Sequence, residues 1–326
     1  MLDLPRLDRI RLTSRPRIQR VLAWALLTPN YELLPGMKIE LDGIERLPSE
    51  PVLYAMNHTD RYNYWPFQYS LWRKTERFTA TWVKGKYYQN AFVGKFMELT
   101  NNIPTVSRGY LVSRDFLNTL GRPPTDDEYA ALRELCDGAS QAALRVPREL
   151  LERPRDVLGR RFEPARESYA EAVDELFRAM MRRFVELNGE AFDKGLDVLV
   201  FPEGTRSRRL SRGHIGLSQI ALRYRRAIVP VGCNGSDLAY PGGSPIARAA
   251  HVVYRIGRPI TWQEMEAYHV REHFEPFTPE AERTHRARFQ GLVDVVMDRI
   301  NALLDEPYRR LENEAREGPR SAARFI

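Results

Sequence analysis

The sequence predicts an α/β fold in which a single mixed sheet is covered by helices. Short apolar runs of strand length alternate with longer segments of helical periodicity, a pattern typical of helices packed on a sheet. Hydrophobic residues make up 43% and charged residues 29% of the 326 residues, so the chain can bury a substantial core. The expected strands are Lys38–Asp42, Val52–Met56, Phe78–Val83, Ile103–Val106, Asp197–Phe201, Ala227–Gly232 and His251–Ile256.

Residues 1–37 are expected to form a basic amphipathic helical segment. Basic residues beside an apolar face with Trp suit a helix lying in a membrane interface, although packing on the protein's own sheet is the alternative. The stretch lacks the apolar core of a signal peptide, and its longest apolar run is far shorter than the ~20 residues of a spanning helix. We therefore expect a cytoplasmic protein held peripherally at the inner membrane face. Arginines at positions 6, 9, 11, 15, 17 and 20 precede Val21, Leu22, Trp24, Leu26 and Leu27.

The main domain is expected to span residues 38–311 and to contain a helical insertion at about 110–188. No convincing strand lies between Gly109 and Gly195. Thr125 and Glu128 have the spacing of a capping box, and a second helix is expected from Glu167 to Leu187, where apolar residues recur every three to four positions. The insertion could be a lid, a membrane contact, an oligomer surface or a structural appendage.

A further helical region is expected from Glu264 onward, followed by a polar tail at residues 312–326. Apolar residues in this region recur at helical spacing, which favours packing against the core. The expected buried stripe is Phe289, Leu292, Val296, Ile300 and Leu303.

The net charge of +7 and the pI of about 9.4 favour anionic partners. These include a membrane phospholipid surface, phosphorylated substrates, coenzyme A and acidic carrier proteins. Nucleic acid is not expected as a partner, because the arginines are dispersed and no nucleic-acid-binding motif is present. Cys136 and Cys233 lie far apart and show neither disulfide nor metal-ligand spacing, so a reducing compartment and no metal are expected.

The first candidate catalytic segment is Asn57–Asn63, with the sequence NHTDRYN. His58 follows an expected strand and precedes an aromatic cluster. A histidine in a loop between a strand and a helix occupies a position where α/β proteins place reactive groups. The aromatic side chains of Tyr62, Tyr64 and Trp65 could line an entrance for an acyl chain, or they could pack a helix.

The second candidate segment is Phe201–Ser207, with the sequence FPEGTRS. Pro202 ends an expected strand, and Gly204 permits close approach of a ligand to the backbone. The guanidinium of Arg206 offers a forked donor for phosphate. Glu203 could accept from a substrate hydroxyl or hold an arginine. A base beside an anion-binding turn is what acyl transfer onto a phosphorylated alcohol requires.

These segments give the chain a resemblance to the glycerolipid acyltransferase superfamily, typified by lysophosphatidic acid acyltransferases. Four blocks occur in the family's order. Asn57-His58 resembles the start of the first, NH-x4-D, and 201–207 reads as the third without substitution. The second block is similar to 103–108, which ends in Arg108, and the fourth to 228–231. Lys84 also stands where the family often has Lys.

The resemblance implies that His58 takes the proton of an acceptor hydroxyl as the hydroxyl attacks the thioester of acyl-CoA or acyl carrier protein. These donors are co-substrates, and no metal or redox cofactor is implied. The favoured acceptor is a lysophospholipid, above all lysophosphatidic acid. Glycerol-3-phosphate or another lysolipid, or a non-catalytic lipid-binding role, are the alternatives. The residues implied in acceptor binding are Arg108, Glu203, Gly204, Thr205, Arg206 and Lys84.

The chain departs from the family at the residue expected to orient His58. The fifth position after the histidine is Asp in the family and Asn63 here. The amide oxygen of Asn63 could accept from the imidazole, or Asp60 could supply a carboxylate. An impaired or lost activity is the third possibility. Ser107 replaces a common acidic residue in the second block, which bears on the identity of the acceptor.

Overall fold

The computed structural model describes residues 1–33 and 36–311. The expected polar tail at 312–326 lies outside the described residues. Seven strands form one mixed sheet in the order β1-β9-β8-β2-β7-β3-β4, in which only the β8–β9 pair is antiparallel. The α/β prediction is confirmed, and each expected strand is present. Their bounds are β1 (Met37–Asp42), β2 (Leu53–Met56), β3 (Thr79–Lys84), β4 (Asn102–Thr105), β7 (Asp197–Val200), β8 (Ile228–Asn234) and β9 (Ala250–Ile256).

The central strands β2, β7 and β8 are buried at every residue. This pattern is expected where helices cover both faces of a parallel sheet. Successive residues of β2 point to opposite faces: Leu53 and Ala55 join one hydrophobic cluster, whereas Tyr54 and Met56 join the other. The edge strand β1 is more exposed.

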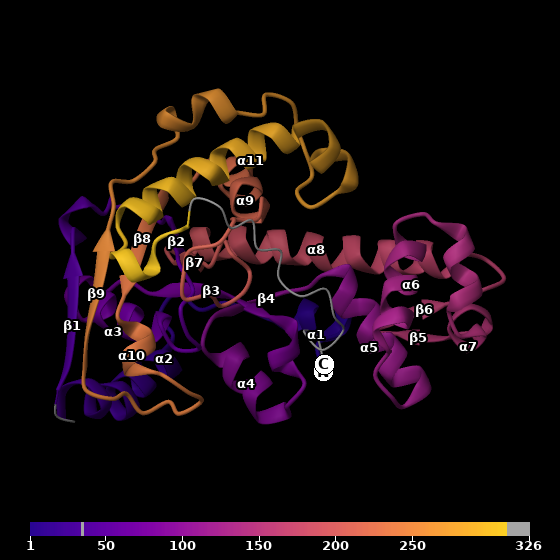
Figure 1. Cartoon of the computed structure of the whole chain (residues 1–326), viewed down its shortest axis with the longest axis horizontal. Coiled ribbons are helices and arrows are strands. Elements are labelled where there is room, and N and C mark those ends of the chain that lie inside the picture. The colour runs from indigo at the N-terminus through magenta and orange to yellow at the C-terminus, as the bar shows by residue number, and fades with distance from the viewer. Residues whose placement is uncertain (34–35, 312–326) are drawn as a thin grey trace.

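Helices α8, α9 and α11 lie on one side of the sheet (Figure 1). Helix α3 lies on the other side, in contact with the π-helical turn Ala23–Leu27 that follows α2. Within the described residues, no helix combines the length and the apolar run needed to cross a membrane. The helices are α1 (Leu4–Arg9), α2 (Arg17–Leu22), α3 (Tyr64–Thr75), α4 (Ala91–Leu99), α5 (Arg108–Leu120), α6 (Asp126–Cys136), α7 (Arg148–Glu152), α8 (Tyr169–Asp193), α9 (Gly216–Tyr224), α10 (Ser236–Ala239) and α11 (Pro279–Ala302).

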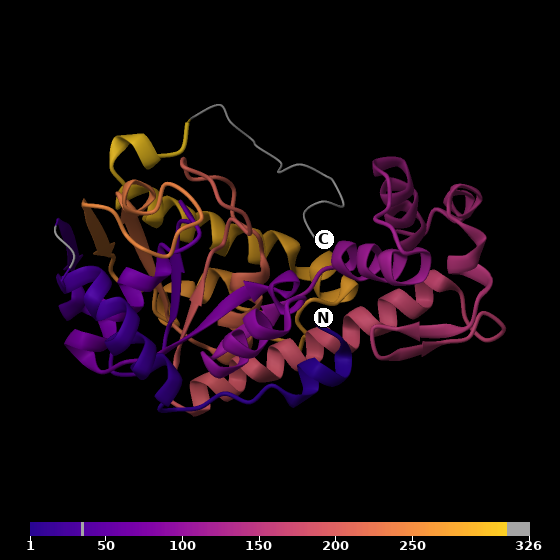
Figure 2. The same ribbon diagram turned by 90° about the horizontal axis from the view of Figure 1, so that it is seen from below.

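The insertion forms a lobe beside the sheet, and α8 runs from this lobe back across the sheet (Figures 1 and 2). The expected capping box is present, since Thr125 and Glu128 bond each other at the start of α6. α8 reaches Asp193, beyond the predicted end at Leu187.

The insertion is not entirely helical, contrary to the prediction. It also contains an antiparallel pair, β5 (Arg155–Val157) and β6 (Arg160–Phe162), which forms a second small sheet. Its strands are only three residues each, too short for a period-two pattern to emerge. Asp115 of α5, which is 1% exposed, holds the pair in place by accepting two bonds from Arg155.

The C-terminal helix begins later than expected. Residues Gln263–Tyr268 form a 3-10 segment, and α11 starts only after Thr278, whose hydroxyl accepts from the backbone of Ala281. The expected stripe is otherwise confirmed, because its first four members are buried while Leu303 is half-buried.

The N-terminal segment also differs from the prediction. α1 packs against α8, and Leu2, Leu7, Ile10 and Leu12 of the first sixteen residues join the core, with Leu2 and Leu7 fully buried. Arg6 pairs with Glu98 at 2.7 Å, and the backbone of Leu4 donates to that of Leu158 in the insertion. The expected amphipathic character begins only at α2, which continues through π-helical turns η1 (Ala23–Leu27) and η2 (Pro29–Leu33).

Replacing Leu7 by Ala should lower the free energy of unfolding by about 2–5 kcal/mol, because it opens a cavity where α1 meets α8. Ile18→Ala is the matched control; Ile18 is 39% exposed, and we expect a change within about 0.5 kcal/mol. Urea unfolding measures both. Equal losses would contradict the placement of α1 in the core.

Candidate active site

The two candidate segments meet at the carboxyl ends of neighbouring parallel strands. β2 pairs with β7, so the loops that follow them leave the same edge of the sheet. The backbone N–H of Ser207 donates to the carbonyl of His58 at 2.9 Å. The rings of His58 and Phe201 are stacked, with centroids 4.0 Å apart. Residues far apart in the sequence therefore form one site.

Asn63 contacts the imidazole of His58. The Asn63 Oδ1 and the His58 Nδ1 are 3.1 Å apart, and the Asn63 Nδ2 donates to the carbonyl of Asn57 at 2.8 Å. This second bond fixes the amide with its oxygen toward the ring, so Nδ1 must carry the proton. The other ring nitrogen, Nε2, is then unprotonated and available as a base. Asn63 is fully buried, and its backbone carbonyl accepts a hydrogen bond from the hydroxyl of Tyr254 at 2.6 Å.

The carboxylate of Asp60 is engaged elsewhere. It accepts from the hydroxyl of Thr59 at 2.9 Å and from the backbone N–H of Tyr62 at 2.8 Å. These bonds close a turn within the loop that carries His58. Of the two candidates for orienting the imidazole, Asn63 is the one placed against it.

Burial lowers the pKa of His58 to about 3, and the hydrogen bond with Asn63 only partly opposes this shift. The positive charges of Arg206 and Lys84 lower the pKa further. Both side chains are therefore close enough to act electrostatically on the imidazole. At neutral pH, His58 is an uncharged base.

Glu203 joins the two loops. One carboxylate oxygen accepts from the backbone N–H of His58 at 2.8 Å, and the other accepts from the N–H and the hydroxyl of Ser211, each at 2.8 Å. The side chain is 2% exposed, and burial raises its pKa to about 7. Glu203 thus holds the histidine loop in place, and its three hydrogen bonds leave one acceptor site of the carboxylate unused.

The turn after Glu203 exposes Gly204 and Arg206, with Thr205 half-buried beside them. Gly204 has a φ of 62°, a left-handed conformation that favours glycine. A Cβ added there would lie 3.0 Å from Cδ2 of His214, so this imidazole lies across the turn. The His214 side chain is itself exposed.

Arg108 is placed differently from the other expected phosphate ligands. Its guanidinium forms an ion pair with Asp174 of α8 and lies 4.3 Å from the ring centroid of Phe177. Ser107 is the N-cap of α5, where its hydroxyl accepts from the backbone of Tyr110 at 3.2 Å. This capping bond accounts structurally for serine at that position. Binding of an acceptor by Arg108 would have to compete with Asp174.

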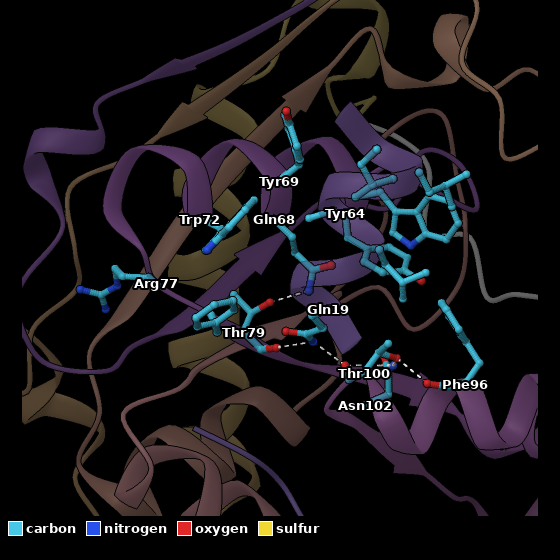
Figure 3. A pocket seen from close by; sticks show the side chains of 16 residues that line it. Gln19, Tyr64, Gln68, Tyr69, Trp72, Arg77, Thr79, Phe96, Thr100 and Asn102 are labelled. Carbon is cyan, nitrogen blue, oxygen red and sulfur yellow. Dashed lines mark hydrogen bonds between the residues drawn. The ribbon is translucent and has the colours of Figure 1, made fainter. Parts of the chain in front are cut away.

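An apolar pocket begins one residue after Asn63 (Figure 3). Tyr64 stands between the pocket and the site, since its ring meets Phe201 edge-on with centroids 6.2 Å apart. Tyr62 lies instead against Tyr240, and its hydroxyl donates to the carbonyl of Gly243 at 2.7 Å. The pocket is lined by Gln19, Leu22, Ala23, Leu26, Leu27, Tyr64, Trp65, Gln68, Tyr69, Trp72, Arg77, Phe78, Thr79, Phe96, Thr100 and Asn102.

Over residues 1–33 and 36–311, no group of three or more His, Cys, Asp or Glu side chains is arranged to hold a metal ion. The available chemistry of the site is a neutral imidazole, two nearby cationic side chains and an apolar pocket.

Comparison with known proteins gives a local match. No protein-family model matches the chain. It is 33% identical over 104 residues to a 1-acyl-sn-glycerol-3-phosphate acyltransferase of Cocos nucifera, a match that spans 30% of this chain and 30% of that relative. This match confirms the resemblance to the glycerolipid acyltransferases.

Among solved structures, the lysophosphatidic acid acyltransferase PlsC of Thermotoga maritima is similar at 15% identity, with a TM-score of 0.39. The alignment covers 91% of this chain and 80% of that one.

Replacing Asn63 by Asp should raise the pKa of His58, because a carboxylate would face the ring at about the distance of the present amide oxygen. In the wild type, the acid limb due to His58 should lie far below pH 6.5, since its pKa is about 3, whereas a limb near pH 7 belongs to Glu203, whose pKa is about 7. In the variant, the acid limb should move to higher pH and the rate at pH 8 should rise. The pH dependence of kcat/KM measures both effects.

Asp60→Asn is the matched control, because Asp60 bonds within its own turn. Its pH profile should match that of the wild type. An unchanged pH profile in Asn63→Asp, or a profile that changes in Asp60→Asn, would contradict the pairing of His58 with Asn63.

Replacing Glu203 by Ala should lower kcat and destabilise the fold by about 1–3 kcal/mol for each buried N–H left without an acceptor. Glu203→Gln keeps one acceptor oxygen and should recover part of kcat. Ser211→Ala removes one hydroxyl donor and should change kcat little. A raised KM for the acceptor with unchanged kcat in Glu203→Ala would indicate substrate contact instead of positioning.

Proposed function

We propose that the protein is an O-acyltransferase that moves a fatty acyl group from a thioester to a hydroxyl of a lysophospholipid. The favoured acceptor is lysophosphatidic acid, and the donor is acyl-CoA or acyl carrier protein. The observation that carries the proposal is the position of His58, whose unprotonated Nε2 lies within the electrostatic reach of Arg206 and Lys84.

In the proposed reaction, Nε2 of His58 takes the proton of the acceptor hydroxyl as its oxygen attacks the thioester carbonyl. The tetrahedral intermediate collapses, the C–S bond breaks, and the leaving thiolate takes the proton back from the imidazolium. An ester and a free thiol result, so the histidine is regenerated without a covalent acyl-enzyme. The local match to an acyltransferase supports this reaction class.

The cationic groups have two effects in this scheme. Arg206 and Lys84 attract the phosphate of the acceptor, and in the free protein they lower the basicity of His58. A bound phosphate offsets their charge, so the imidazole becomes a better base when the acceptor is present. Gly204 and Thr205 lie in the same turn and can offer backbone N–H groups to the phosphate.

The apolar pocket provides a place for a fatty chain. Its lining includes Tyr64, whose ring contacts Phe201, and Phe201 in turn stacks on the imidazole of His58. A lysophospholipid or a fatty thioester would bury its chain there, whereas glycerol-3-phosphate as acceptor would leave the pocket to the donor alone. Competition between acceptors distinguishes these two cases.

A lipid-binding protein without turnover is the second candidate. Asn63 favours it, because an amide cannot supply the charge that stabilises an imidazolium. In serine proteases, replacing the orienting Asp by Asn lowers kcat by about 10⁴. The ion pair between Arg108 and Asp174 also favours a lipid-binding protein without turnover, because an acceptor would have to compete with Asp174 for Arg108. This candidate requires lipid binding with no product from any acceptor.

Replacing His58 by Ala should abolish acyl transfer while the fold survives, because the side chain is the base of the proposed reaction. Arg206→Ala should raise KM for the phosphorylated acceptor and leave kcat less affected, because the exposed Arg206 binds the phosphate. Mass spectrometry of the products with both donors, together with urea unfolding of each variant, measures these effects. Absence of transfer by the folded wild type across a panel of acceptors would overturn the proposal.

A further inference from the structure

Several large apolar side chains are exposed on two segments that are distant in sequence. Trp24 of η1 is 74% exposed, and Phe92 of α4 is 88% exposed. We use the name docking face for Val21, Trp24, Leu26, Phe92 and Leu99, all of which are exposed. Exposing aromatic and aliphatic side chains together to water is unfavourable, so such a patch indicates a partner.

The two segments lie next to each other. The amide of Gln19 in α2 donates to the carbonyl of Thr100, which directly follows α4. α2 and α4 also occupy the same lower side of the molecule in Figure 1. Phe92, Phe96 and Leu99 share one stripe of α4 at helical spacing, so the apolar surface continues along that helix.

The docking face borders the apolar pocket. Leu26 belongs to both, since it lines the pocket and is 37% exposed. Phe96 also lines the pocket, and on α4 it lies between the exposed Phe92 and Leu99. The pocket wall therefore passes into the exposed surface at the junction of η1 and α4.

Basic side chains accompany the exposed apolar ones. Arg17 and Arg20 of α2 and Lys95 of α4 are exposed. Lys95 forms a pair with Glu98 at 3.4 Å, while Glu98 is also held by Arg6. Exposed Trp and Phe beside Arg and Lys match the chemistry of a bilayer interface that contains anionic lipid.

We propose that the docking face binds an anionic lipid bilayer through η1 and α4 together, and that the apolar pocket opens into the bilayer between them. The second clause rests on the proposed function, because it assigns the pocket to a fatty chain that enters from the membrane. The first clause does not depend on catalysis. The N-terminal sequence alone predicts membrane contact for that segment. The sequence of α4 carries no such pattern, and the structure adds this helix to the face.

Co-sedimentation with vesicles tests the proposal without any substrate. The probes are phosphatidylcholine vesicles with and without phosphatidylglycerol. We expect the wild type to bind the anionic vesicles and to dissociate partly at high salt. Phe92→Ser and Trp24→Ser should each weaken binding by about tenfold, the effect of withdrawing an aromatic side chain from an apolar environment.

Leu144→Ser is the matched control, because Leu144 is 90% exposed on the insertion, in a 3-10 segment outside the docking face. It should bind like the wild type, and so should His58→Ala. Equal binding by Phe92→Ser and wild type would overturn the role of α4. Loss of a dimer in Phe92→Ser by analytical ultracentrifugation, with vesicle binding intact, would assign the face to a second copy of the chain.

The outcomes separate this proposal from the proposed function. If vesicle binding depends on Phe92 and no acyl transfer is found, the docking-face proposal is supported and the proposed enzymatic function is contradicted. If the protein transfers acyl groups to a lysolipid in detergent but its vesicle binding is unchanged in Phe92→Ser and Trp24→Ser, the docking-face proposal is contradicted and the proposed function is supported.

Discussion

The carboxylate of Glu203 holds the loop of the candidate base against the loop of the candidate phosphate ligand. It accepts from the backbone of His58 with one oxygen and from Ser211 with the other, in an almost fully buried position. Leaving these buried donors unpaired in the interior is costly. Because β2 and β7 are neighbours, this side chain and the bond from the Ser207 N–H to the His58 carbonyl together hold the histidine loop against the turn that carries Arg206.

A second constraint is the neutral character of the pair formed by His58 and Asn63. The amide orients the ring as a carboxylate would, but it adds little stabilisation to the protonated form. Burial and the nearby cations keep the imidazole uncharged. The proposed mechanism therefore depends on the acceptor's phosphate to offset these cations, which links substrate binding to the strength of the base.

The sequence was sufficient to predict the seven strands of the main sheet and the meeting of the two loops. Apolar runs bounded by Pro, Gly and polar residues define buried strands well, and adjacent parallel strands bring their carboxyl ends to one edge. Other features depended on tertiary contacts. The short pair β5–β6 had too few residues to show a period, and the burial of Leu7 depends on α8, more than 160 positions further along the chain.

Side-chain partners were equally hard to foresee. The motif placed Glu203 and Arg108 with the acceptor-binding residues, whereas their actual contacts are a backbone N–H in one case and Asp174 in the other. Such pairings join residues 145 and 66 positions apart, and local pattern carries no information about them. Asn63 was the exception, since the resemblance already made it, with Asp60, a candidate for orienting His58.

The most direct test of the central claim is ¹⁵N NMR of the His58 imidazole in the full chain during titration with glycerol 3-phosphate, a soluble phosphorylated alcohol. We expect the free protein at pH 7 to show a proton on Nδ1 and none on Nε2, and we expect the pKa of the ring to rise as the phosphate binds. In Arg206→Ala this response should weaken. A ring that is already charged at pH 7, or a phosphate that binds without changing the ring's pKa, would contradict a shared site for base and phosphate.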